Sequence, residues 1–200
     1  MQKLQGDGAN MAVVVHDNRP VGVITLEDIL EEVVGRIEDE YPRLPRLYLK
    51  DALSAGGVVL DMAATDSEEA IRELMATVPA ANFPANVNVT SLALARERQL
   101  PTDVGNGVAI PHARCPGLAM PVMVVGRSAE GVVFNPSKED PVRLIFLLVT
   151  PAERPQTQVF FLAQLAQVAA SELVRERIAR ATTPQEVIQI IAAADPAVTG

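Results

Sequence analysis

Two kinds of short apolar segment alternate along the chain from Tyr48 onward. The first kind is rich in Val, Ile and Leu and is bounded by Gly or Pro, as strands are: residues 58–62, 120–127, 131–135 and 142–149. The second kind repeats apolar residues at helical spacing or follows a capping residue: a segment that starts at Asp66 or Ser67, and residues 91–98, 159–168, 171–179 and 184–191. Because segments of both kinds share one stretch of chain, the sequence predicts an α/β domain.

The composition is that of a soluble globular protein. Of the 200 residues, 48% are hydrophobic and 21% are charged, which excludes an intrinsically disordered chain. Apolar runs such as residues 144–149 are far shorter than the roughly 20 residues that a membrane-spanning helix needs. The N-terminus also lacks the basic and then apolar pattern of a secretory signal. We therefore expect a cytoplasmic location.

Charge and cysteine content exclude further classes of protein. A formal net charge of −8 leaves no basic face for a nucleic-acid backbone, so we expect no nucleic-acid partner. The single cysteine, Cys115, forms neither an intramolecular disulfide nor a metal cage, and we interpret it as a small packed residue. The acidic run at residues 38–40 is typical of a solvated helix end. No metal-ligand spacing appears, and we expect neither a metal nor a cofactor.

Two prolines, Pro42 and Pro45, mark a boundary in the chain. Proline disfavours a helix and restricts the residue before it, so this stretch favours an extended connector. The charge also changes there, because residues 1–45 carry a net charge of −5 and the remaining residues carry −3. We predict a linker over residues 42–47, an N-terminal region over residues 1–41 and a larger domain over residues 48–197.

The N-terminal region has the pattern of two strands and a helix. Residues 11–15 and 21–25 are β-branched runs on either side of turn residues, which predicts a hairpin. Residues 26–37 repeat apolar side chains at helical spacing. A unit of about forty residues buries little apolar surface on its own. We therefore expect it to gain order by packing on the larger domain or by pairing with a second copy as a homodimer.

The same residues resemble the second half of a CBS module, as found in membrane cation-efflux proteins. The resemblance covers residues 10–41 and rests on MAVVV (11–15), GVITLEDILEEVVG (22–35) and IEDEY (37–41). It implies that the natural polypeptide is longer upstream of Met1, because CBS motifs work in pairs around adenosyl ligands. It also implies a nucleotide-binding role, toward ribose, for Thr25 and Asp28. The alternative is that they are the cap and a first-turn residue of the helix, which is the interpretation that capping preferences favour.

The loop at residues 102–114 has the clearest pattern for chemistry. Gly105, Asn106 and Gly107 permit positive φ angles, so their N–H groups could hold an anion beside a short strand at residues 108–110. His112 follows that strand, and a neutral imidazole is a good nucleophile at physiological pH.

Two arginines lie close to this histidine in the sequence. Arg96 precedes His112 by sixteen positions and Arg114 follows it by two, and either guanidinium could grip phosphate in a fork of hydrogen bonds. Phosphoryl transfer needs little more than such positioning and charge neutralisation. The residues alone leave a plainer alternative open, in which the histidine is structural and the glycines form an ordinary turn.

Residues 48–195 resemble the enzyme IIA domain of the bacterial phosphoenolpyruvate:sugar phosphotransferase system, in its fructose, mannitol and nitrogen-regulatory class. The resemblance rests on RE (96–97), Thr102, GNGVAIPHAR (105–114), PVRLIFLLV (141–149) and LAQLA (162–166). It implies a mixed sheet flanked by helices. It also implies that His112 takes a phosphoryl group from a small histidine-containing phosphocarrier protein, and that Arg96 lies beside it.

The sequence departs from this family at two positions. Members commonly carry a second active-site histidine four residues before the first Leu-Ala pair of this segment, Leu162-Ala163. Here that position is Gln158. A glutamine amide has no titratable proton but still donates a hydrogen bond to phosphate, so we expect impaired onward transfer. Asp103 stands where a glycine is usual, and its carboxylate would oppose phosphate if it faced the anion.

These observations predict a phosphohistidine-carrying regulatory domain. We expect His112 to be phosphorylated by the phosphocarrier protein and the domain to control an attached or separate membrane transporter. The alternative is a regulatory or interaction module that has the enzyme IIA fold and binds a partner or an anion without phosphoryl transfer.

Overall fold

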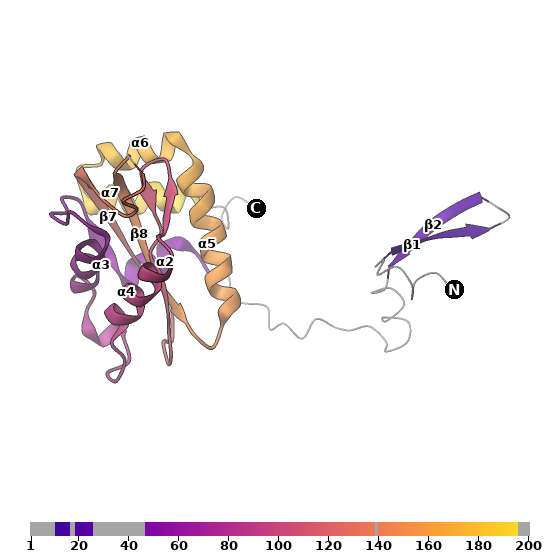
Figure 1. The fold of residues 1–200 in the computed structure, drawn as a ribbon, viewed down its shortest axis with the longest axis horizontal. Helices are drawn as coiled ribbons and strands as arrows, with labels where there is room; N and C mark the ends of the chain where they lie inside the picture. The colour runs from indigo at the N-terminus through magenta and orange to yellow at the C-terminus, as the bar shows by residue number, and fades with distance from the viewer. Residues whose placement is uncertain (1–10, 17–18, 26–46, 139, 196–200) are drawn as a thin grey trace. The chain divides into compact units, whose positions relative to one another are not determined.

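The computed structural model describes residues 11–16, 19–25, 47–138 and 140–195 (Figure 1). The chain divides into two compact units, Met1–Leu44 and Pro45–Gly200, which we describe separately.

The first unit contains a strand pair. Strands β1 (Met11–His16) and β2 (Arg19–Thr25) are antiparallel, and their register is irregular between Val14 and Val15. The predicted hairpin is therefore present. The predicted helix at residues 26–37 lies outside the described residues, as do Asp28 and the acidic run 38–40.

The second unit is built on a mixed sheet, as expected. Its strands follow the order β3-β7-β8-β5-β4, and β6 also pairs with β8. Strand β8 is antiparallel to β7 and parallel to both β5 and β6, while β3 is parallel to β7 and β4 antiparallel to β5. The strands are β3 (Gly57–Val59), β4 (Asp103–Gly105), β5 (Val108–Ala109), β6 (His112–Cys115), β7 (Val122–Val132) and β8 (Val142–Pro151).

Helices cover both faces of this sheet. They are α2 (Leu49–Ala55), α3 (Ser67–Ala76), α4 (Val89–Gln99), α5 (Pro155–Ala170), α6 (Glu172–Arg180) and α7 (Pro184–Ala194), with a short 3₁₀ turn at Ala80–Asn82. Successive side chains of a strand point to opposite faces. Accordingly Ile145 and Leu147 pack with α3 and α4, whereas Phe146 and Leu148 pack with α2, α5, α6 and α7. Figure 1 shows α4 and α5 on opposite sides of the sheet.

Side-chain caps begin several helices where the sequence predicts them. Asp66 accepts a hydrogen bond from the Glu69 N–H, and Thr183 accepts one from the Glu186 N–H just before Pro184. These bonds satisfy N–H groups that the first turn of a helix leaves free.

Strand β7 and helix α5 differ from the predictions in their bounds. Residues 120–127 and 131–135 were expected as two strands, but β7 is one strand whose register shifts between Arg127 and Val132. The residues between Arg127 and Val132 are not paired with β8. Among them, Gly131 has φ = 91° and its N–H donates to the Ser128 hydroxyl at 3.0 Å. Helix α5 begins at Pro155 instead of residue 159, because its first turn is polar and gives no apolar signal even though Thr157 and Gln158 are buried.

Helix α2 was not predicted, and its cap comes from the far end of the unit. The Leu49 N–H donates to Asp195 Oδ2 at 2.7 Å, and Asp195 is fully buried. The residue before α2, Tyr48, makes no side-chain cap. The Asp195 carboxylate, which follows α7, therefore accepts a hydrogen bond from an N–H group at the start of α2.

Replacing Asp195 by Ala should lower the free energy of unfolding by about 1–3 kcal/mol, because it leaves the Leu49 N–H buried without this acceptor. For a chain of this size the expected fall in Tm is roughly 2–4 °C per kcal/mol. Thermal unfolding followed by circular dichroism measures it. Asp61→Ala is the control, because the Asp61 side chain is 91% exposed. Equal stability of the two variants would contradict this capping role.

Candidate functional site

His112 begins β6, beside the middle of β8. It pairs in register with Leu148, and its side chain is half-buried. The Leu148 N–H donates to the Pro111 carbonyl at 2.9 Å, which fixes the backbone just before the histidine.

A backbone carbonyl fixes the tautomer of this imidazole. Nδ1 of His112 lies 2.9 Å from the Ile110 carbonyl oxygen. A carbonyl only accepts hydrogen bonds, so Nδ1 carries the proton and the lone pair of the neutral ring is on Nε2. Nε2 is therefore the nucleophilic atom of His112.

A cleft of about 580 Å³ lies between α4, β6 and α5 and includes His112. Its polar lining consists of Arg96, Gln99, His112, Arg114 and Gln158. Apolar side chains also border it, namely Leu92, Val159 and Leu162, of which Val159 is 64% exposed. The cleft thus combines a nucleophile, two guanidinium groups and an open apolar rim.

Arg96 reaches this cleft from the last turn of α4. One Nη1 N–H donates to the Leu100 carbonyl at 3.0 Å, and this is its one hydrogen bond to the described residues. The next residue, Glu97, is buried and accepts from the Thr102 N–H at 2.9 Å and from the Thr102 hydroxyl at 2.6 Å. Glu97 therefore fastens the end of α4, which carries Arg96, to the chain that leads into β4.

Arg114 and Gln158 are joined by a hydrogen bond. Arg114 lies two residues after His112 on β6, so both side chains are on one face of the strand. Its Nε donates to Oε1 of Gln158, a buried residue in the first turns of α5. Gln158 thus holds a guanidinium beside His112 through a contact that does not titrate.

The surroundings favour the neutral form of His112. Burial lowers its pKa, Arg96 and Arg114 lower it further, and the bond from Nδ1 to the Ile110 carbonyl opposes them. A neutral imidazole with its lone pair on Nε2 is the form that attacks an electrophile.

The imidazole of His112 should titrate below 6.5, the ordinary value for histidine. The neutral ring is the form present above its lowered pKa, so phosphoryl uptake should persist as the pH falls through 6.5 and decline only below that pKa. Proton–nitrogen correlation spectra of the ring give the midpoint. Arg114→Gln should raise the midpoint by removing a nearby cation, whereas Arg98→Gln, outside the cleft, should not. A midpoint at or above 6.5 would refute this electrostatic account.

The Gly-Asn-Gly turn does not line this cleft. Gly105, Asn106 and Gly107 have φ angles of 88°, 54° and 68°, so the predicted left-handed conformation is present. The Gly107 carbonyl, however, accepts from the N–H groups of Arg143 and Leu144, at the start of β8.

Strand register explains this separation. Val108 pairs with Leu144, whereas His112 pairs with Leu148 four residues further along β8, which is about 13 Å. The turn, which was predicted to hold an anion, therefore borders a different cavity from the one that contains His112.

Asp103 does not face the His112 cleft either. Its Oδ1 accepts from the Gly105 N–H at 2.8 Å and forms an ion pair with Lys138 Nζ at 3.0 Å. The Asp103 carboxylate closes the glycine turn and is compensated by a cation, so it does not oppose an anion at His112.

The remaining candidates have structural settings. Cys115 is fully buried, and burial raises the pKa of its thiol, which suits the predicted packing role. Thr25 is the last residue of β2, and Asp28 lies outside the described residues. Within the described ranges no group of His, Cys, Asp and Glu side chains is arranged to hold a metal ion. In the same residues, no helix has the length and apolar character to cross a membrane.

The side chains that sequence reasoning missed are Gln99 and the apolar rim of Leu92, Val159 and Leu162. Spacing within α4 offers a partial signal, because Leu92, Arg96 and Gln99 are separated by four and three residues and share a helix face. Nothing in the sequence indicates which residues of α5 meet that face.

Comparison with known proteins agrees with this fold. The family model of the phosphoenolpyruvate-dependent sugar phosphotransferase system, EIIA 2, matches residues 52–194, and the chain belongs to this family. A fructose-specific EIIA component of the phosphotransferase system from Haloferax volcanii is 33% identical over 99 residues. These residues are 50% of this chain and 64% of that protein, so the chain spans less than two thirds of that relative.

Solved structures are similar over most of the second unit. The crystal structure of the nitrogen regulatory protein IIA-Ntr from Neisseria meningitidis has a TM-score of 0.63 and 28% identity, and the match covers 71% of this chain and 97% of that one. Mannitol enzyme IIA from Escherichia coli, solved in complex with phosphorylated mannitol enzyme IIB, has a TM-score of 0.54 and 25% identity, with coverage of 68% and 94%.

The family match begins after the N-terminal unit. The resemblance of residues 10–41 to a CBS module, and the boundaries at residues 41, 47 and 197, therefore stay predictions.

Proposed function

We propose that this chain is a phosphohistidine-carrying regulatory domain in which Nε2 of His112 accepts a phosphoryl group from a histidine-containing phosphocarrier protein. The observation that carries the proposal is the contact of His112 Nδ1 with the Ile110 carbonyl, which leaves the lone pair on Nε2. The cleft supplies cations for the incoming group and opens at an apolar rim suited to a protein partner.

In the transfer step, Nε2 of His112 attacks the phosphorus atom of the donor phosphohistidine. The donor P–N bond breaks, and its electron pair returns to the donor imidazole. His112 keeps its proton on Nδ1 and its bond to the Ile110 carbonyl. Arg96 and Arg114 stabilise the charge on the phosphoryl oxygens, which is most of what such a transition state requires.

Gln158 takes part in this step through Arg114 and through its own amide. Its Oε1 is occupied by the Arg114 N–H, so the amide nitrogen is the group with protons to offer a phosphoryl oxygen. It cannot take up or release a proton as the phosphoryl group leaves. We therefore assign phosphate contacts to Arg96, Arg114 and Gln158, and slow onward transfer to the missing titratable group.

The partners in this proposal are a phosphocarrier protein and a membrane transporter, attached or separate, with the domain in the cytoplasm. Regulation is favoured over sugar uptake because the N-terminal residues resemble a CBS module. An adenosyl ligand would bind a complete CBS pair in a longer natural polypeptide. A homodimer is a separate proposal, in which a second copy orders the N-terminal region.

A specific observation favours the second candidate function, an interaction module without turnover. The position usual for a second histidine holds Gln158, and that glutamine is already bonded to Arg114. Such a site binds an anion or a partner surface without the proton chemistry of transfer.

Incubation of the chain with phosphoenolpyruvate, the general phosphotransferase enzyme and the phosphocarrier protein tests the proposal. We expect an acid-labile mass gain of one phosphoryl group, with the group on Nε2 by phosphorus–nitrogen coupling. Gln158→His should change the return of the group to the phosphocarrier more than its uptake. A folded chain that takes up no phosphate would instead establish the interaction module.

A further inference from the structure

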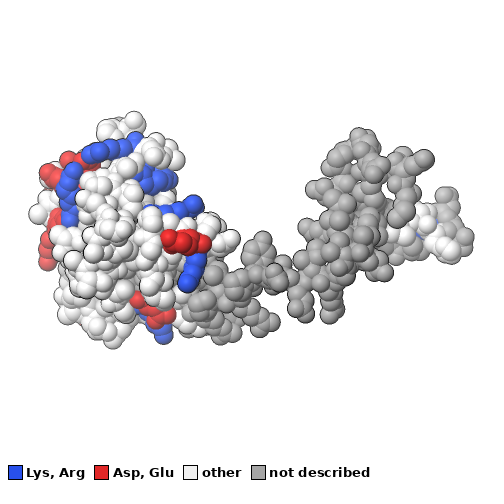
Figure 2. Space-filling view, turned by 90° about the horizontal axis from the view of Figure 1, so that it is seen from below, with Lys and Arg blue, Asp and Glu red and all other residues white. Residues whose placement is uncertain are grey.

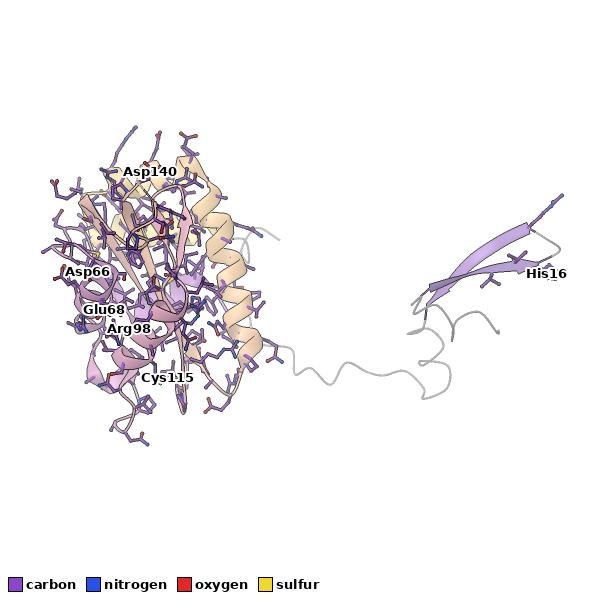
Figure 3. The ribbon with its side chains drawn as sticks, in the orientation of Figure 1. His16, Asp66, Glu68, Arg98, Cys115 and Asp140 are labelled. Carbon is purple, nitrogen blue, oxygen red and sulfur yellow. The ribbon has the colours of Figure 1, made fainter. Side chains whose placement is uncertain are left out.

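A second cavity, of about 590 Å³, lies outside the His112 cleft. It is bordered by the Gly-Asn-Gly turn, the end of β7, the start of β8 and helix α6. Figure 3 shows Asp140, which lines this cavity, near one end of the sheet and Cys115 toward the other. The cavity has the size of ordinary small-molecule sites and shares no lining residue with the cleft.

Two arginines in this cavity have unused hydrogen-bond donors. Arg143 donates one bond, from Nε to the Ala129 carbonyl at 3.3 Å, and Arg175 donates one, from Nη1 to the Ala169 carbonyl. Neither forms an ion pair within the described residues. A guanidinium group has five N–H donors, so most of the fork of each side chain is open to a ligand.

The other charges around the cavity are largely compensated. Arg127 donates to four backbone carbonyls and lies 3.7 Å from Asp61, and Glu176 pairs with Arg180 at 3.3 Å. Asp140 is the one lining carboxylate without an ion pair among the described residues. Once Arg180 is counted as the partner of Glu176, four arginines and three carboxylates surround the cavity, which is a net charge of +1 although the chain as a whole is negative.

Neutral groups complete the lining. The Ser128 side chain is buried, and its oxygen accepts the Gly131 N–H, which leaves its O–H to donate to a ligand. Asn106, in the left-handed turn, is exposed and also lines the cavity. The buried side chains of Leu144 and Ile178 form an apolar wall of the cavity.

We propose that this second cavity is a binding site for a small organic oxyanion, distinct from the phosphoryl site. Arg143 and Arg175 grip its phosphate or carboxylate oxygens through charge-assisted hydrogen bonds, and Ser128 adds a donor. Asp140 accepts from a hydroxyl or ammonium group of the same ligand, and Leu144 and Ile178 contact its carbon chain. The ligand class is therefore a hydroxyl- or amine-bearing phosphate ester or carboxylate. Such a metabolite is a suitable regulatory ligand for this domain.

Glycerol 3-phosphate and glutamate are suitable probes, one for each oxyanion. We would titrate each into the ¹⁵N-labelled chain and follow amide shifts, with calorimetry for the Kd. We expect saturable shifts at Asn106, Gly107, Ser128 and Ala129 with at least one probe. Binding of the first probe alone would identify a phosphate ester site, and binding of the second alone a carboxylate site.

Variants separate this site from the His112 cleft. Arg175→Gln should weaken binding about tenfold or more, as the loss of a charge-assisted bond does. The matched control is Arg177→Gln, two residues along α6 and outside this cavity, which should bind normally. His112→Ala should also bind normally, whatever its effect on phosphorylation. Saturable shifts confined to the His112 cleft, no binding of either probe at millimolar concentration, or equal weakening in both arginine variants would overturn the proposal.

Discussion

A His112→Ala chain should take up no phosphoryl group from the phosphocarrier protein. The imidazole supplies the nucleophilic Nε2, and alanine leaves the two arginines of the cleft with nothing to phosphorylate. The neighbouring Gln158 offers only an amide, which is not a nucleophile. Mass spectrometry of the intact chain after incubation with the complete phosphoryl donor system measures the result, and we expect complete loss of the acid-labile adduct.

The chain provides its own control for this substitution. It has two histidines, and the other, His16, lies in β1 of the first unit. His16→Ala should be phosphorylated like the parent chain. Circular dichroism shows whether the His112→Ala chain stays folded, as expected for a half-buried side chain at a strand end. Uptake that survives in a folded His112→Ala chain would place the chemistry elsewhere.

Arg96→Lys should slow phosphorylation of His112 by roughly ten- to a hundredfold, the equivalent of one or two charge-assisted hydrogen bonds. Lysine keeps the positive charge but loses the planar fork that meets two phosphoryl oxygens together. It also loses the bond by which Arg96 is held to the Leu100 carbonyl. Single-turnover uptake from the phosphorylated carrier gives the rate.

The matched control is Arg98→Lys, two residues along the same helix. Arg98 pairs with Glu68 on α3 at 2.6 Å, outside the cleft, and Figure 3 shows the two side chains together. This variant should be phosphorylated at the parent rate. If Arg96→Lys were equally fast in a folded chain, Arg96 would have no part in binding phosphate.

Local features of this fold could be predicted from the sequence because neighbouring residues determine them. Asp66 and Thr183 cap helices through bonds to N–H groups three residues later. The strand that carries His112 and Arg114 was not predicted, because the sequence placed both residues in a loop after residues 108–110. The mixed sheet, in contrast, was expected from family resemblance, because apolar periodicity does not record the direction in which a strand runs.

Features that depend on distant contacts could not be predicted. The glycine turn is only five residues from His112 in the sequence, but the pairing of β5 and β6 along β8 places it at another cavity. Likewise, helix α2 depends on a carboxylate 146 residues away. On the surface that Figure 2 shows, Lys and Arg side chains are interspersed with Asp and Glu side chains.

The hydrogen bond between Leu49 and Asp195 brings the first and last helices of the second unit together, because α2 starts at one partner and α7 ends just before the other. A domain whose entry and exit points adjoin can be inserted into a loop of a host protein with little displacement of the host's flanking segments. The same hydrogen bond makes the stability of the unit sensitive to removal of its last residues. A chain cut before Asp195 would lose the acceptor at the start of α2, 146 residues from the cut. Architecture of this kind suits a module that is carried intact between different polypeptides.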